Sequence, residues 1–130
     1  MVEDRLTDGK RIAQFVASEV EGHEDLPLGV SDADPDVEPT EDGALAYRIV
    51  RTGADGEKGE DGDAVAEVYV HPDRARAEFV AAVDVAAEAA DAEGLRVRPK
   101  AVRPPRTLVF VEDGAQVKWL LPALRAVAEE

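Results

Sequence analysis

Three short segments rich in branched and aromatic apolar residues constrain the fold of this chain most. They cover residues 44–51, 64–70 and 106–112, and in the first of them Leu45 and Ile49 lie on the opposite side from Arg48. A period of two residues is typical of β-strands. Glycine, proline and acidic residues separate the segments, so the sequence predicts several strands joined by turns.

Two weaker segments also have strand character. Leu26, Leu28 and Val30 form a short apolar stretch within a polar connection, which favours an edge strand there. Residues 95–98 predict a further short strand. The prolines at 99, 104 and 105 keep the following stretch extended and outside any central ladder.

Two other segments have helical periodicity, residues 7–21 and 72–92. Thr7 or Asp8 can cap the first helix, and Pro72 suits the first turn of the second, where its missing N–H costs nothing. Apolar residues recur at helical spacing in both segments. They are Ile12, Phe15, Val16 and Val20 in the first and Phe79, Val83, Ala86 and Ala90 in the second.

The C-terminal segment 113–128 fits two structures. Asp113-Gly114 between apolar runs is a hairpin signal, which predicts a strand at 115–120. Asp113 and Gln116 also have the spacing of a capping box, which favours one helix. Proline inside a helix costs about 3 kcal/mol but little in the first turn. Because of Pro122 we expect the strand, followed by a helix at 122–129.

Together these segments predict one α+β domain over residues 1–130. We expect an antiparallel sheet of four or five strands with helices on one face, in the order α-β-β-α-β-β-α. The acidic, glycine-rich and proline-rich stretches near 31–43 and 52–63 are expected to be mobile loops. The aromatic residues Phe15, Phe79, Phe110 and Trp119 are expected in the core.

The composition and the absence of certain motifs exclude several classes of protein. The chain has 29 acidic and 15 basic residues, a net charge of −14, and no cysteine. It therefore has no disulfide framework or thiolate chemistry. We find no apolar run of membrane-spanning length, no signal peptide and no phosphate-binding glycine motif, so we expect a cytoplasmic protein with no membrane partner and no cofactor.

The basic residues gather in one place. Between Gly94 and Val111 there are five basic residues and no acidic one. We call this set the basic island: Arg96, Arg98, Lys100, Arg103 and Arg106. Arginine forks suit carboxylates and phosphates, so the island predicts contact with an anionic partner or ligand. The alternative is that the arginines neutralise the chain's own carboxylates.

Nucleic acid is a weak candidate for that partner. The island has no aromatic residue for base stacking, and phosphate contacts weaken steeply with salt. A protein partner or a second copy of the chain fits better.

The remaining candidates for chemistry are fewer. His71 lies at a predicted strand-to-helix junction, where it can act as an acid or base or simply as a junction residue. No nucleophile is spaced around it, so we assign no catalytic residue. The row Asp32, Asp34, Asp36 and Glu38 lacks the glycine and the final glutamate of a calcium loop. We expect solvated carboxylates there rather than a metal site.

The chain as a whole resembles the small uncharacterised proteins of haloarchaea. The resemblance rests on the stretches Leu6-Thr7-Asp8-Gly9-Lys10-Arg11-Ile12-Ala13 and Arg98-Pro99-Lys100-Ala101-Val102-Arg103-Pro104-Pro105, and on abundant carboxylates with few lysines. It implies a cytosol of molar salt and carries over no activity or site residue. We therefore expect a non-enzymatic binding or assembly module that uses residues 96–106. The alternative is a small enzyme or metabolite-binding protein with His71 beside the basic island.

Overall fold

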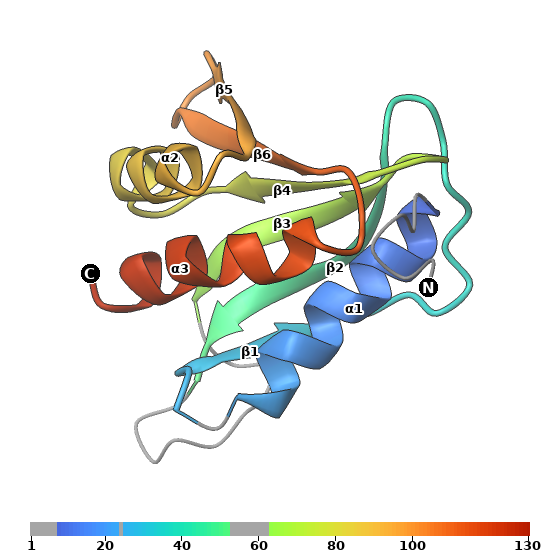
Figure 1. The fold of residues 1–130 in the computed structure, drawn as a ribbon, viewed down its shortest axis with the longest axis horizontal. Coiled ribbons are helices and arrows are strands. Elements are labelled where there is room, and N and C mark those ends of the chain that lie inside the picture. The colour runs from blue at the N-terminus through green and yellow to red at the C-terminus, as the bar shows by residue number, and fades with distance from the viewer. Residues whose placement is uncertain (1–7, 24, 53–62) are drawn as a thin grey trace.

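A computed structural model describes residues 8–23, 25–52 and 63–130 of the chain. It is an α+β structure with three helices and one six-stranded antiparallel sheet (Figure 1). The elements are α1 (Gly9–Gly22), β1 (Leu28–Ser31), β2 (Ala44–Arg51), β3 (Ala64–Val70), β4 (Ala75–Phe79), α2 (Val83–Ala92), β5 (Arg96–Lys100), β6 (Arg106–Val111) and α3 (Gln116–Ala128). The predicted class is correct, whereas the predicted strand number and element order are wrong.

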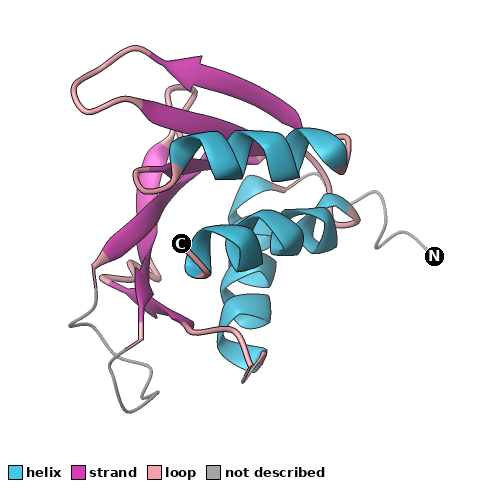
Figure 2. Ribbon diagram, turned by 90° about the vertical axis from the view of Figure 1, so that its left-hand side faces the viewer, coloured by secondary structure: helices cyan, strands magenta, loops and turns pink. Residues whose placement is uncertain are grey.

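The strands lie in the order β1-β2-β3-β4-β6-β5, and every neighbouring pair is antiparallel. All three helices pack against the same face of the sheet (Figure 2). Strand β6 inserts between β4 and β5, so the basic β5 becomes an edge strand. The opposite face carries no helix of the described chain, and it is called the open face below.

The predicted helix at 72–92 is wrong in its first half. Residues 75–79 form β4, which pairs with β3 on one side and β6 on the other, and only Val83–Ala92 is helical. Ala75, Ala77 and Phe79 point into the core with at most 2% exposure. Alanine and phenylalanine fit a helix stripe as well as a strand face, so local periodicity could not separate the two. Two ladders of hydrogen bonds decided the outcome.

The predicted strand at 115–120 is also wrong, because residues 116–128 form one helix that contains Pro122. Two side-chain hydrogen bonds close the turn that leads into it: the Asp113 carboxylate accepts from the Gln116 N–H, and the Gln116 amide oxygen accepts from the Glu112 N–H. The proline costs about 3 kcal/mol. Burial of each leucine or valine contributes about 1.5–3 kcal/mol, which offsets that cost. Five residues of the helix are buried: Val117, Leu120, Ala123, Leu124 and Val127.

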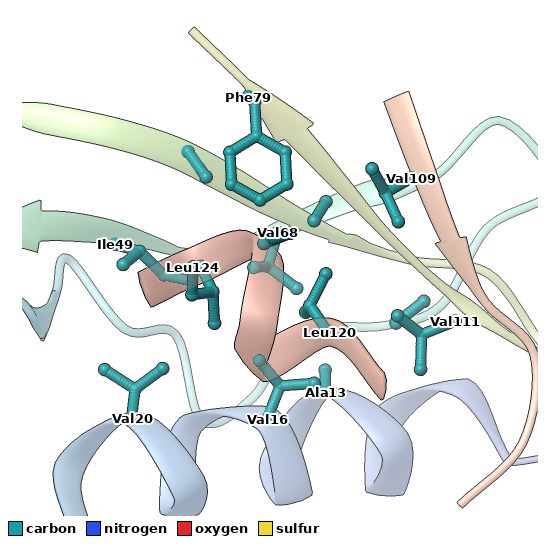
Figure 3. Close-up of a cluster of buried hydrophobic side chains, with 14 of the residues drawn as sticks. Ala13, Val16, Val20, Ile49, Val68, Phe79, Val109, Val111, Leu120 and Leu124 are labelled. Carbon is teal, nitrogen blue, oxygen red and sulfur yellow. The ribbon is translucent and has the colours of Figure 1, made fainter. Parts of the chain in front are cut away.

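The core lies between the sheet and the helices. Figure 3 shows Val16 and Val20 of α1 and Leu120 and Leu124 of α3 facing sheet residues such as Phe79. The prediction that Phe15, Phe79, Phe110 and Trp119 lie in the core is confirmed for Phe79 and wrong for Phe15 and Trp119, which are each 40% exposed. Phe110 is half-buried on the open face, beside Arg76 of β4 and Arg96 of β5.

The connection between β1 and β2 is anchored to the domain at several points. The Asp34 N–H donates to the Ala46 carbonyl at 2.8 Å, and the Thr40 N–H donates to the Val70 carbonyl at 3.3 Å. Val37 is 7% exposed and packs into the core. Most of the second loop predicted to be mobile, at 52–63, lies outside the described residues.

No helix in the described part of the chain is long and apolar enough to span a bilayer.

Candidate functional site

The open face of the sheet carries most of the charged side chains that the strands contribute. Cross-strand partners share a face, so the register places Arg48 beside Glu67, Tyr69 beside Arg76, and Glu67 beside Glu78. The same rule places β5 side chains next to those of β6. The charged strand residues on this face are Arg48, Glu67, Arg76, Glu78, Arg96, Arg98, Lys100 and Arg106, six cations with two carboxylates.

Glu78 is the centre of this network. Its residue is 1% exposed although it lies on the face without helices, because three cationic side chains cover it. Arg76 donates to one carboxylate oxygen through Nε and Nη2, both at 2.9 Å. Arg106 Nη1 and Lys100 Nζ lie 2.9 and 3.5 Å from the other oxygen. A buried carboxylate needs such full pairing.

Glu67 is the second carboxylate, and it shares Arg106 with Glu78. Arg106 Nη1 lies 2.9 Å from Glu67 Oε1, the Tyr69 hydroxyl donates to the same oxygen at 2.7 Å, and Arg48 Nε lies 3.5 Å from the other oxygen. Burial alone would raise the pKa of Glu67. The hydrogen bonds from Tyr69 and Arg106 outweigh that effect and hold the pKa below its ordinary value.

Arg76 contacts an aromatic ring, a backbone carbonyl and a histidine in addition to Glu78. Its guanidinium lies 4.6 Å above the centre of the Tyr69 ring and donates to the Asp42 carbonyl at 3.1 Å and to His71 Nε2 at 2.9 Å. Gly43 has φ +95°, and a Cβ there would lie 2.9 Å from Arg76 Nη1. Glycine at 43 therefore allows both the turn before β2 and the close approach of Arg76.

His71 has a structural role in this arrangement. Its residue is 3% exposed, and its Nδ1 lies 2.9 Å from the Glu41 carbonyl. A carbonyl only accepts and a guanidinium only donates, so Nδ1 carries the proton and the ring is neutral. Burial, helped by Arg74 and Arg76, lowers the pKa of His71 below its ordinary value. The histidine is linked to the basic island through Arg76 and Glu78, and its ring is buried.

The structure divides the basic island into two parts. Lys100 and Arg106 pair with Glu78, and Arg96 pairs with Glu112 while its guanidinium lies 5.6 Å from the Phe110 ring centre. The side chains of Arg98 and Arg103 are exposed and make no ion pair within the described ranges. Three residues of the basic island therefore pair with the chain's own carboxylates. The other two, Arg98 and Arg103, are available for contact with a partner.

Sequence reasoning missed Arg48, Glu67, Arg76 and Glu78. The signal that could have found two of them is the run Ala75-Arg76-Ala77-Glu78-Phe79, which alternates charged and apolar residues as a half-buried strand does. The opposition of Glu67 and Glu78 depends on register between strands and has no local signal.

The row Asp32, Asp34, Asp36 and Glu38 contributes an ion pair and a turn hydrogen bond in the structure. Asp32 lies 3.6 Å from Arg48, and Asp34 accepts from the Asp36 N–H at 3.0 Å. Within the residues that the structure describes, no three histidine or carboxylate side chains gather closely enough to hold a metal ion.

Comparison with known proteins identifies a family and no activity. A family model described as "Family of unknown function (DUF7993)" matches residues 1–130. Neither a curated protein nor a solved structure matches the chain.

Proposed function

The chain belongs to this family of unknown function, and we propose from its open face that it is a non-enzymatic binding module whose β5 edge contacts an acidic protein surface. Arg98 on β5 and Arg103 in the turn after it would make the contact. One observation carries the proposal: both arginines are exposed and lack an ionic partner among the described residues, in a chain with 29 carboxylates. The planar fork of arginine suits bidentate pairing with a carboxylate.

The surroundings of these two arginines support a protein partner. Val102, between Lys100 and Arg103, is 40% exposed and offers apolar contact. Pro99 lies on the edge strand, where a missing N–H costs least and where it discourages pairing with the edge of another sheet. The partner would therefore contact side chains rather than extend the ladder.

The aromatic rings of the open face do not favour nucleic acid. Arg76 covers the Tyr69 ring, and Arg74 and Arg96 lie 5.8 and 5.6 Å from the centre of the Phe110 ring. Base stacking would require moving those cations.

We also propose that the module works in a cytoplasm of molar salt, as in haloarchaea. A net charge of −14 on a small domain opposes compaction unless ions screen it. At 1 M salt the screening length is about 3 Å, so only directly touching charges still attract. Paired side chains and apolar contact such as that of Val102 would then supply the affinity.

The test is site-specific photo-crosslinking in 2–3 M KCl, roughly the range in which such screening is complete. A photoreactive amino acid replaces Val102, and cross-linked products are identified by mass spectrometry. The test variant is Arg98→Glu/Arg103→Glu. Its matched control is Arg11→Glu/Lys118→Glu, which changes the net charge equally at two exposed cations on α1 and α3.

We expect one protein product with an acidic contact surface, lost in the test variant and kept in the control. Loss in both variants would show a bulk charge effect. The same product in all three proteins, a nucleic acid product, or no product would each reject the proposal. Circular dichroism checks that both variants fold.

A further inference from the structure

A hollow lies on the helix side of the sheet, away from the open face. It has a volume of about 280 Å³ and lies between α1, the end of β1 and the connection that follows it. Figure 1 shows this connection passing beside α1. Its lining includes Lys10, Ala17, Asp34, Ala46 and Tyr47.

The interior of this hollow is apolar. Besides Ala17 and Ala46, its walls include Val30, Pro35, Val37 and Val70. The polar groups of the walls are satisfied elsewhere: the Tyr47 hydroxyl donates to the Ala13 carbonyl at 2.6 Å, and the Ala46 carbonyl accepts from Asp34 N–H at 2.8 Å. Small alanine side chains leave space that a larger residue would fill. Ligand pockets combine such an apolar interior with a few placed polar groups.

The lining of the hollow carries one charge of each sign. Lys10 and Gln14, one helical turn apart on α1, stand on one side, and Asp34 stands on the connection. Lys10 and Asp34 do not form an ion pair with each other, nor with any other residue that the structure describes. The Asp34 carboxylate makes only a local bond, from the Asp36 N–H. Two opposite charges that do not pair with each other, in the lining of an apolar hollow, are complementary to a zwitterion with an apolar tail.

We propose that this hollow binds a free α-amino acid with an apolar side chain. The side chain fills the space beside Ala17 and Tyr47, Lys10 receives the carboxylate, and Asp34 receives the ammonium group. A fatty acid anion would place its carboxylate next to Asp34, and a simple amine would place its charge next to Lys10, so each is disfavoured by one like charge. This site is independent of the β5 edge.

Isothermal titration calorimetry with three ligands tests the proposal. The ligands are L-leucine, 4-methylpentanoate, which lacks the ammonium group, and L-leucinamide, which lacks the carboxylate and mimics the first residue of a peptide. We expect saturable leucine binding, about tenfold or more tighter than that of either analogue, as one charge-assisted contact implies. Absence of saturable leucine binding, or an analogue that binds equally well, would overturn the proposal.

Three variants locate the binding. Ala17→Leu fills the hollow and should abolish leucine binding, whereas Ala89→Leu, at a partly buried alanine of α2, should not. Lys10→Gln should remove the advantage of leucine over leucinamide. Asp34→Asn keeps an oxygen for the Asp36 N–H and should remove the advantage over 4-methylpentanoate. Leucine binding that survives Ala17→Leu, or selectivity unchanged in both charge variants, would reject the site.

Discussion

Glu67 and Glu78 face each other as cross-strand partners on β3 and β4, and one nitrogen of Arg106 lies 2.9 Å from an oxygen of each. Directly opposed like charges destabilise a sheet. The guanidinium of Arg106, which both carboxylates share, compensates that repulsion and links β6 to β3 and β4. The open face, over which the described part of the chain places no helix, is therefore held together by charge pairing.

The first prediction concerns that bridge. Arg106→Met should leave one buried carboxylate oxygen of Glu78 with Lys100, at 3.5 Å, as its remaining recorded ion-pair partner. Breaking a buried pair from one side costs about 3–5 kcal/mol, and the partial exposure of Arg106 places the expected loss near the lower end, about 3 kcal/mol. Urea unfolding in constant KCl measures it.

The matched control for this prediction is Arg98→Met, which removes an exposed and unpaired arginine from the neighbouring strand. Its effect should stay within about 0.5 kcal/mol. Equal losses in the two variants would mean that the Arg106 bridge does not stabilise the fold.

The second prediction concerns pH. The pKa of His71 is lowered in the fold, so between its folded value and its ordinary value of 6.5 the unfolded chain binds more protons. The free energy of unfolding therefore falls as pH drops below about 6.5. Glu67, whose pKa is also lowered, adds a further loss only below its ordinary value of 4.5. Urea unfolding between pH 8 and pH 5 measures the contribution of His71, because the contribution of Glu67 changes only at lower pH.

His71→Asn is the comparison for the pH series. It should be less stable at pH 8, since Arg76 loses an acceptor, and its stability should depend less on pH between 7 and 5. A pH dependence equal to that of the wild type would show that another group titrates in this window.

The third prediction separates backbone strain from close approach. Gly43 and Gly94 both have positive φ, +95° and +91°, but only at Gly43 would a Cβ meet Arg76. Gly94→Ala should cost the left-handed strain alone, about 1 kcal/mol. Gly43→Ala should cost more, because Arg76 must also move away from the position in which it contacts Asp42 and His71. Equal losses of unfolding free energy would contradict this account of Gly43.

The fourth prediction concerns salt. Lowering KCl from molar to millimolar concentrations should unfold the protein or leave it without fixed tertiary packing, because the Debye length grows from about 3 Å to beyond 30 Å. Far-ultraviolet circular dichroism follows secondary structure, and the fluorescence of the half-exposed Trp119 follows its surroundings. An unchanged protein in dilute buffer would show that pairing on the open face suffices without screening.

Part of this structure could be read from local pattern. Strands β2 and β3 and helix α1 follow the predicted ranges closely, because each has a dense, consistent periodicity over its own length. The cluster of cations at 96–106 could also be recognised from the sequence. The pairing of Lys100 and Arg106 could not, because it depends on Glu78, a residue on another strand.

The sequence by itself determined the α+β class, the main strands, the first helix and the separation of a basic segment from an acidic chain. Tertiary structure alone decided that residues 75–79 are a strand, that α3 runs through Pro122, and that Glu67, Glu78, Arg76 and Arg106 meet. The physical reason is one of magnitude. Local propensities differ by about 1 kcal/mol or less per residue, or about 3 kcal/mol for proline in a helix. Two ladders of hydrogen bonds or a buried helix face add more than that through contacts between distant segments.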